Sequence, residues 1–247
     1  MGGRTCPHCG MALRTVTRSI GGRAYEVEES CTCEGALADV ERRRAAEADA
    51  ARVRAASGAV RRSGMPERFW SVPRDGEGLA ALTARGFGLY LYGPVGTGKT
   101  YTACGVAKAW VWDHTTTYDG REYVAAPCRY RSVPRLLQEM RECYDGHGDQ
   151  AELAGALMRC RLLVLDDMGQ ESPTEWALER LWEIVDQRWS NRRPTVVTSQ
   201  CSPAQLAQRL ASRGSLRTAE SIVSRLCGAE SEVRRIDGPD RRAQSDV

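Results

Sequence analysis

The fold is decided by the stretch Gly93-Pro94-Val95-Gly96-Thr97-Gly98-Lys99-Thr100. The apolar residues 87–92 precede it, and a run rich in small apolar residues, 103–109, follows it. The predicted order is therefore a strand, a glycine-rich loop and a helix, which is the context that a phosphate-binding P-loop requires. The alternative is a glycine-rich turn that matches by chance, and the full match in this context disfavours it.

The residue types of this loop suit the binding of a nucleoside triphosphate. Glycine takes backbone torsions that other residues avoid, so Gly93, Gly96 and Gly98 let backbone N–H groups approach phosphates closely. Lys99 would reach the β- and γ-phosphates, and the Thr100 hydroxyl would hold Mg²⁺. We expect ATP to be bound by the loop and the residue after it: Gly93, Pro94, Val95, Gly96, Thr97, Gly98, Lys99, Thr100 and Tyr101.

A second motif supports the first. Residues 162–165 form a continuous apolar run that ends in Asp166 and Asp167, as expected of a strand buried on both faces of a parallel sheet. Taken alone, two adjacent aspartates usually belong to a solvated loop. At the end of a buried strand that follows a P-loop, they indicate a Walker B element. Asp166 would then hold Mg²⁺, usually through water, and Asp167 would orient or deprotonate the attacking water.

Length and composition limit the class of protein. The chain has 247 residues, enough for one α/β domain and a small appendage, and its net charge of +3 indicates no particular partner. No apolar run approaches the roughly 20 residues of a membrane span, and the N-terminus lacks the apolar core of a signal peptide. We therefore expect a soluble, cytoplasmic protein, in which ten cysteines favour metal ligation or burial over disulfides.

The first 35 residues carry two pairs of cysteines about twenty residues apart. Alternating stretches around two adjacent glycines predict a β-hairpin between the pairs. Four thiolates in this arrangement are typical of a zinc ribbon, in which a tetrahedral Zn²⁺ supplies most of the stability. Two alternatives stay open: a redox or incidental cysteine motif, and replacement of one thiolate by His8. The expected zinc ligands are Cys6, Cys9, Cys31 and Cys33.

Composition also sets the boundaries between the parts of the chain. Residues 1–35 form the zinc-ribbon-like module. Residues 36–62 are rich in alanine, glutamate and arginine and predict a helix that is either a spacer or a surface for a partner. Residues 63–83 form a linker, residues 84–242 the ATPase domain, and residues 243–247 a disordered tail.

Within the ATPase domain the pattern predicts alternating strands and helices. A strand is expected at residues 128–131, helices at 150–158 and 174–189, and a polar loop at 115–122. Residues 194–200 form another buried strand, whose polar end lies at the sheet edge of the nucleotide, where a γ-phosphate sensor would sit.

The C-terminal part is predicted to be helical. One of its helices carries Arg225, whose apolar neighbours would direct it outward, toward the nucleotide of a neighbouring subunit. There it would act as an arginine finger, which stabilises charge on the transferred phosphoryl group. The alternative is a solvated surface arginine.

Together these motifs resemble those of the AAA+ ATPases of the DnaC/IstB type. Besides the P-loop, the resemblance rests on residues 163–169 and 195–200 and on two flanking segments, 63–69 and 131–137, and it covers about residues 60–242. It implies an α/β fold: a P-loop AAA+ core of three layers (α/β/α) with a parallel sheet and a short C-terminal helical lid. The small zinc-ribbon-like module and its helix precede this core.

The resemblance also implies roles for matching residues. Residues 224–226 are similar to the element that carries the arginine finger, here Arg225. Residues 238–242 resemble the terminal Gly-x-x-x-Arg element, which places Arg242 in the sensor 2 position, with Arg241 as the alternative. At the sensor 1 position the family usually has asparagine, and glutamine here keeps the amide but adds a methylene. The implied catalytic residues are Lys99, Asp167, Gln200 and Arg225.

The implied function is that of a DnaC-like helicase loader. ATP and Mg²⁺ would bind at the subunit interface of a homo-oligomer that grips single-stranded DNA, and the N-terminal module and helix would bind the replicative hexameric helicase, a DnaB-like protein. The nearest alternative is an IstB-like ATPase that assists a transposase. A non-hydrolysing scaffold and a zinc-dependent DNA-binding regulator are further alternatives. The arginines expected to form either the DNA surface or a solvated basic face are Arg129, Arg131, Arg135 and Arg141.

Overall fold

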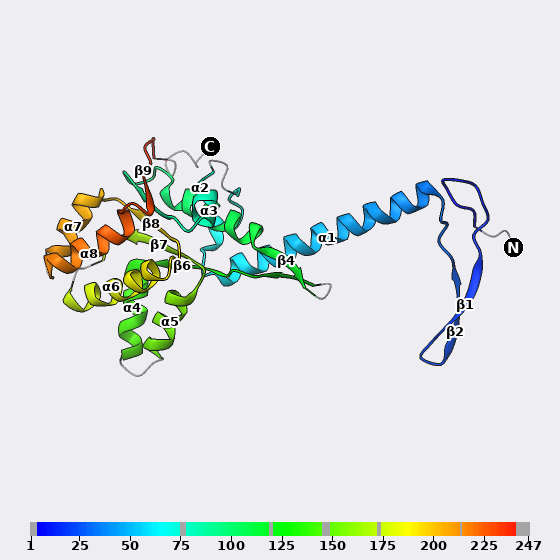
Figure 1. Ribbon diagram of the computed structural model, residues 1–247, viewed down its shortest axis with the longest axis horizontal. Helices are drawn as coiled ribbons and strands as arrows, with labels where there is room; N and C mark the ends of the chain where they lie inside the picture. The colour runs from blue at the N-terminus through cyan, green and yellow to red at the C-terminus, as the bar shows by residue number, and fades with distance from the viewer. Residues whose placement is uncertain are drawn as a thin grey trace. The chain divides into compact units, whose positions relative to one another are not determined.

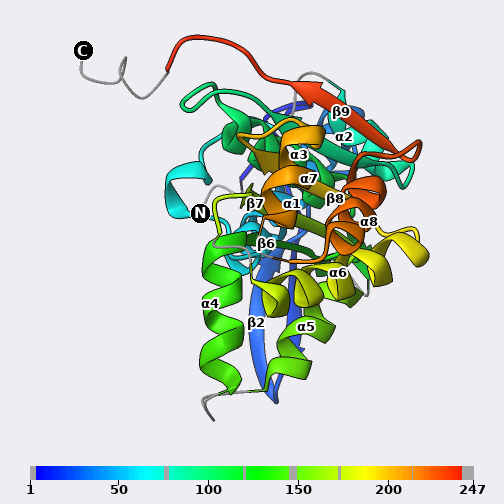
Figure 2. The ribbon, with the colours of Figure 1, turned by 90° about the vertical axis from the view of Figure 1, so that its left-hand side faces the viewer.

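The computed structural model describes residues 4–74, 78–118, 121–144, 149–171, 174–212 and 214–240 (Figure 1, Figure 2). The chain divides into two compact units, Met1–Val53 and Arg54–Val247. The division falls inside helix α1 (Glu34–Arg62). The first unit contains the cysteine pairs and the second contains the P-loop.

The first unit contains a β-hairpin between the cysteine pairs, as predicted. Strands β1 (Thr15–Ile20) and β2 (Arg23–Glu28) pair antiparallel. The turn consists of Gly21 and Gly22, with φ of 60° and 79°, the left-handed torsions that favour glycine in a two-residue hairpin loop. Every residue of β2 is exposed, so the two strands bury no core of their own. Their stability must therefore come from other contacts.

The second unit contains a sheet of five parallel strands in the order β6-β7-β8-β3-β9. Strands β3, β7 and β8 are buried along nearly their whole length, because helices cover both faces of a parallel sheet. The P-loop follows β3 and the Walker B residues end β7, so both motifs lie at the carboxyl edge of the sheet. The strands are β3 (Gly88–Tyr92), β6 (Cys128–Ser132), β7 (Leu162–Met168), β8 (Thr195–Ser199) and β9 (Ser231–Arg235).

A hydrophobic core on each face of this sheet produces the predicted α/β/α layers (Figure 1, Figure 2). Side chains alternate along a strand, so Leu163 and Leu165 of β7 face one core while Leu162 and Val164 face the other. Helices α4 to α8 cover the first face, and α2, α3 and the last turns of α1 cover the second. The helices are α2 (Leu79–Ala84), α3 (Lys99–Asp113), α4 (Val133–Tyr144), α5 (Gln150–Arg159), α6 (Glu175–Ser190), α7 (Pro203–Ala211) and α8 (Leu216–Cys227).

Side-chain caps fix where several of these helices begin. The side chains of Asp149, Thr174 and Ser215 accept hydrogen bonds from backbone N–H groups in the first turns of α5, α6 and α8. Ser202 and Gln205 form a reciprocal capping box at the start of α7. These caps satisfy N–H groups that have no partner inside the helix.

A second hairpin replaces the polar loop predicted at residues 115–122, so that prediction is wrong. Strands β4 (Thr115–Tyr118) and β5 (Arg121–Val124) pair antiparallel between α3 and β6. Threonine, tyrosine and valine favour an extended backbone, and polarity alone does not distinguish an exposed hairpin from a loop. Tyr118 and Tyr123 make an edge contact across the hairpin, with ring centroids 6.3 Å apart.

The C-terminal part contains the predicted helices, α7 and α8, but a strand that was not predicted follows them. Strand β9 lies at the edge of the sheet beside β3, although its sequence is mostly charged and predicts no strand. An edge strand is only half covered, so charged side chains are tolerated there. Helices α7 and α8 lie between β8 and β9 and pack into the core, and no helical lid follows β9 within the described residues 236–240.

No helix in the described part of the chain is both long and apolar enough to cross a membrane.

Candidate nucleotide-binding site

The P-loop joins β3 to α3 and has the backbone of an anion cradle. Its glycines have positive φ, 146° at Gly93, 79° at Gly96 and 98° at Gly98. Helix α3 begins at Lys99, directly after the last of these glycines. The torsions bring backbone N–H groups of the loop together, and the N-terminus of α3 adds its partial positive charge. The loop and the helix are therefore suited to bind phosphate groups.

The side chains of the loop are partly buried and partly exposed. Lys99 is 7% exposed, and its Nζ donates to the carbonyl oxygen of Pro94 at 2.5 Å. Thr97 Oγ1 donates to the same carbonyl at 3.0 Å, which closes the loop on itself. Val95 in the loop and Tyr101 directly after it are exposed, where a bound nucleotide could contact them.

Asp166 lies at the centre of a hydrogen-bond network. Its Oδ1 accepts from Thr100 Oγ1 at 2.9 Å and from Thr198 Oγ1 at 2.6 Å. Its Oδ2 accepts from Tyr130 Oη at 2.5 Å. The residue is only 4% exposed, and a carboxylate offers about four acceptor positions, so the network leaves little freedom to rotate. The two residues predicted to hold Mg²⁺, Thr100 and Asp166, are thus in direct contact, as a shared ion requires.

No motif points to Tyr130 or Thr198 as a site residue. Tyr130 lies in the middle of β6 and Thr198 near the carboxyl end of β8, the two strands that flank β7. Hydroxyl groups on the strands beside the Walker B strand are the signal that could have identified them. Burial and the negative charge of Asp166 raise the pKa of Tyr130, so the phenol stays protonated and keeps donating. Thr198 Oγ1 also accepts from the backbone N–H of Asp167 at 3.0 Å and so connects the two aspartates.

Asp167 lies within an irregularity of β7. Its φ of 59° is uncommon for a residue other than glycine, and the pairing of β7 with β8 shifts register before Met168. Its Oδ1 accepts from Gln170 Nε2 at 2.9 Å. Ser199 pairs with Met168, and Gln200 follows it as an exposed residue. The predicted catalytic carboxylate and the predicted sensor amide therefore share the sheet edge of the P-loop.

A pocket of about 520 Å³ opens beside these carboxylates. Thr100, Asp166 and Asp167 line one part of it, and Arg68 and Arg131 are among the residues that line the remainder. A hydrated ion and an attacking water therefore have access to both aspartates.

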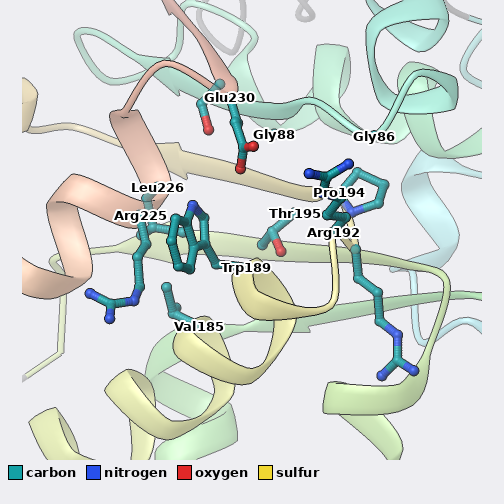
Figure 3. Close-up of a pocket in the computed structure, with 12 residues that line it drawn as sticks. Gly86, Gly88, Val185, Trp189, Arg192, Pro194, Thr195, Arg225, Leu226 and Glu230 are labelled. Carbon is teal, nitrogen blue, oxygen red and sulfur yellow. The ribbon is translucent and has the colours of Figure 1, made fainter.

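Arg225 lies at the opposite edge of the sheet. Figure 3 shows it on α8 beside Trp189 of α6, at a pocket lined in part by the first residues of β3, β8 and β9. One guanidinium nitrogen lies 2.7 Å from Asp186 Oδ1, and another donates to the Ser221 carbonyl oxygen at 3.1 Å. The P-loop follows the carboxyl end of β3, whereas this pocket lies where the strands begin. The structure therefore does not bring Arg225 to the nucleotide site of its own chain.

The predicted sensor 2 residue, Arg242, and its alternative, Arg241, lie outside the described residues, as does the tail 243–247. The described chain reaches Asp240, whose carboxylate lies against Gly96 of the P-loop.

The N-terminal cysteines form a single cluster in the first unit. Their sulfur atoms all lie within 4.8 Å of one another, with 3.7 Å between Cys6 and Cys33 and 3.5 Å between Cys9 and Cys31. Zn–S bonds of about 2.3 Å in a tetrahedron imply sulfur separations of about 3.8 Å, so the cluster fits Zn²⁺. Hydrogen bonds from the backbone N–H groups of His8 and Cys9 lower the pKa of Cys6 to about 6. The neighbouring thiols and burial raise the pKa of Cys9, to about 12, and that of Cys33, so Cys6 is the member of the cluster that most readily supplies a thiolate.

The alternatives for this cluster are less well supported. The Nε2 atom of His8 lies 2.6 Å from Asp39 Oδ2, so the imidazole is already paired outside the cluster. All four cysteines are free thiols. If the first cysteine pair were incidental, the second pair, more than twenty residues later, would have no reason to lie beside it. The structure instead brings all four sulfur atoms together.

Comparison with known proteins agrees with this geometry. The family model described as IstB-like ATP binding protein matches residues 80–246. The putative insertion sequence ATP-binding protein y4pL of Sinorhizobium fredii is 36% identical over 112 residues, 45% of this chain and 40% of that protein. The replicative helicase loader DnaI of Bacillus subtilis is 27% identical over 165 residues, 65% of this chain and 49% of that protein. The chain therefore spans less than half the length of both of these curated relatives.

A solved structure shares the fold. The crystal structure of DnaI superposes with a TM-score of 0.57 and 23% identity, covering 72% of this chain and 95% of that chain. The family match extends over most of the chain and confirms the resemblance inferred from the motifs. The chain therefore belongs to the family of IstB-like ATP-binding proteins, which are P-loop proteins of the AAA+ type.

Proposed function

We propose that this protein is a DnaC-like helicase loader, an ATP-hydrolysing protein that binds the replicative helicase and loads it on single-stranded DNA. The observation that carries the proposal is the cysteine cluster ahead of the P-loop unit, since an IstB-like transposition ATPase is expected to begin with a helical segment. The match to DnaI also extends over more of this chain, 65%, than the 45% matched by y4pL.

ATP hydrolysis would take place at the carboxyl edge of the sheet. In this proposal, the P-loop and Lys99 bind the phosphates, Asp167 orients or deprotonates the attacking water, and Gln200 contacts that water. Thr100 and Asp166 would hold Mg²⁺, which when bound neutralises charge on the transferred phosphoryl group. The contact between Thr100 and Asp166 supports this assignment because it positions two oxygen ligands before the ion arrives.

A second copy of the chain would complete each site. Arg225 lies too far from its own P-loop to act there, so it would stabilise the transferred phosphoryl group on a neighbouring copy. In the same proposal, Arg242 is the sensor 2 residue of the chain's own site. ATP would then be bound between subunits of a homo-oligomer.

The remaining parts of the chain would bind the partners. The module of residues 1–35 and the helix of residues 36–62 would bind the helicase, the helix through its turns before residue 54, because its last turns pack on the core of the second unit. The linker 63–83 would join them to the ATPase domain 84–242, and its final residues begin α2, which packs on the same core.

The proposed surface for single-stranded DNA lies on β6 and α4. Within it, the guanidinium groups of Arg131 and Arg135 share one carboxylate, Glu139, at 3.8 Å and 3.4 Å, which leaves a net positive charge. Such a surface suits the phosphate backbone of DNA. Its residues are Arg129, Arg131, Arg135 and Arg141.

Capture of the replicative helicase from the same source would test the loader proposal. We expect the intact chain to retain the helicase in the presence of ATP, and the double variant C6S/C31S to lose it while still binding ATP. Cys143→Ser is the matched control, because Cys143 is a free cysteine outside the cluster. Turnover of ATP stimulated by single-stranded DNA would exclude a non-hydrolysing scaffold.

A second candidate function is assistance of a transposase, favoured by the 36% identity to an insertion sequence ATP-binding protein. Absence of helicase capture from a preparation with full ATPase activity would contradict the loader proposal. Capture of a transposase by the same preparation would establish the second candidate.

A further inference from the structure

The chain beyond β9 passes directly over the P-loop. The backbone N–H of Ile236 donates to the Tyr92 carbonyl at 2.7 Å, which anchors the segment beside the end of β3. The carbonyl oxygen of Ile236 occupies the space that a Cβ atom on Gly93 would need. The carboxylate of Asp240 occupies the corresponding space at Gly96. We call residues 236–240 the strap.

The strap brings a negative charge to a cradle built for anions. Gly96 lies between the other two glycines of the loop, and all three have the positive φ that exposes backbone N–H groups to a ligand. The N-terminus of α3 adds partial positive charge to the same place. A carboxylate is attracted there for the same reason as a phosphate, and a bound triphosphate would meet it as a like charge at close range.

The other acid of the strap is placed differently. Asp237 Oδ1 lies 3.0 Å from Arg235 Nε, and both side chains are well exposed. Asp237 is therefore paired with the last residue of β9. Gly238 lies between the two aspartates with a φ of 149°, a backbone conformation that favours glycine and allows the chain to turn before Asp240.

We propose that Asp240 is a further residue of the nucleotide site that opposes binding: its carboxylate lies against the P-loop and must move away when ATP binds. The proposal rests on nucleotide binding by the P-loop as proposed above. Because Ile236 is anchored to β3 while Asp240 contacts the loop, displacement of the carboxylate bends the strap at Gly238. Occupancy of the nucleotide site is thereby coupled to the conformation of the strap.

Nucleotide affinity of the full chain tests the proposal. The dissociation constant of a fluorescent, non-hydrolysable ATP analogue would be measured for the wild type, Asp240→Asn and Asp237→Asn. We expect Asp240→Asn to tighten binding by about tenfold, since it removes a like charge without changing the size of the side chain. Asp237→Asn is the matched control in the same segment and should change binding by less than about twofold.

Hydrogen exchange provides a second measurement. In the wild type, the ATP analogue should speed backbone exchange in the strap, because the carboxylate leaves the loop. In Asp240→Asn, exchange in the strap should already be fast without nucleotide.

The outcomes separate this inference from the function on which it rests. Unchanged or weaker binding by Asp240→Asn would overturn the inference alone, and weaker binding would mean that the carboxylate contacts the nucleotide favourably. Binding that survives Lys99→Ala, or no binding by either form, would overturn the P-loop assignment and this inference with it.

Discussion

At the scale of single residues, Asp166 shows how hydrogen bonds from several elements fix the orientation of one carboxylate. Hydroxyl groups from α3, β6 and β8 donate to its two oxygens, so three elements determine the direction of one carboxylate. A buried carboxylate with few partners would bind a proton or leave its site, because the charge is costly to bury. The hydroxyl groups satisfy three acceptor positions of the Asp166 carboxylate and fix its orientation. This suits the role proposed for Asp166, which is to hold an ion that arrives and leaves with the nucleotide.

The first prediction concerns Tyr130. Its replacement by phenylalanine leaves Oδ2 of Asp166 buried without its phenol donor, which should lower the free energy of unfolding by about 1–3 kcal/mol. Urea denaturation measures the change. Tyr123→Phe is the control: that residue is 46% exposed in the β4–β5 hairpin, and its variant should lie within about 0.5 kcal/mol of the wild type. Equal stability of the two variants would show that the phenol does not support Asp166.

At the scale of elements, the N-terminal module and the sheet are stabilised by different means. The β1–β2 hairpin is exposed and buries no core, whereas the strands of the large sheet are covered on both faces. The cysteine cluster at the base of the hairpin is therefore the feature expected to order the module.

The second prediction concerns metal content. We expect about one zinc ion per chain after exhaustive buffer exchange, because four thiolates fill a tetrahedral site. Cys31→Ser should reduce bound zinc to near zero, and Cys143→Ser should leave it unchanged; elemental analysis measures both. Nucleotide affinity should be the same in all three proteins, since the P-loop lies in the other unit. Full zinc occupancy in Cys31→Ser would contradict a site of four cysteines.

At the scale of the whole molecule, the two edges of the sheet carry different parts of the proposed reaction. The P-loop and the aspartates lie at the carboxyl edge, and Arg225 lies at the opposite edge with Asp186. One chain then contains every group that the proposed reaction needs, but Arg225 is separated from the other groups by the length of the strands. In the proposed function, a second copy would bring the arginine to the phosphates.

The third prediction follows from this separation. Arg225→Ala should lower ATP turnover by about 10³-fold, the usual contribution of an arginine finger, and Lys99→Ala should abolish it. Mixing the two variants should restore part of the activity, because some interfaces pair an intact P-loop with an intact arginine. A mixture of Lys99→Ala with Asp167→Asn is the control and should stay inactive, since both defects lie on the same side of the interface. No recovery in the first mixture would contradict an arginine acting between copies.

The fourth prediction concerns alkaline pH. Burial raises the pKa of Tyr90, Cys104 and Cys128, and that of Cys227 to about 12, above the values of about 9 and 10 expected in the unfolded chain. The native state therefore keeps protons that the unfolded state loses. The contribution of these four groups to stability should be constant below about pH 8 and fall as the pH rises further, by about 1.4 kcal/mol per pH unit for each titrating group. Urea midpoints at pH 8, 9 and 10 measure this, and a flat profile would contradict it.

The sequence by itself determined the features that depend on local pattern. Three features consist of particular residue types at fixed separations along the chain, so the sequence is enough to find them. They are the glycine spacing of the P-loop, the apolar run before Asp166 and the paired cysteines. Predictions from local sequence pattern were wrong for strands that are only partly covered by other parts of the protein. The β4–β5 hairpin and β9 are polar strands at exposed or edge positions, where hydrophobic periodicity gives no signal.

Only the tertiary structure decided which distant residues meet. Tyr130 and Thr198 reach Asp166 across parallel strands that are separated by 36 and 32 residues along the chain, and their own surroundings in sequence are those of ordinary strand residues. The sequence likewise does not indicate that Asp240 contacts the P-loop, or that Arg225 lies at the opposite edge of the sheet from the P-loop. These contacts depend on strand order and register, which are set by the packing of the whole sheet and not by any single segment.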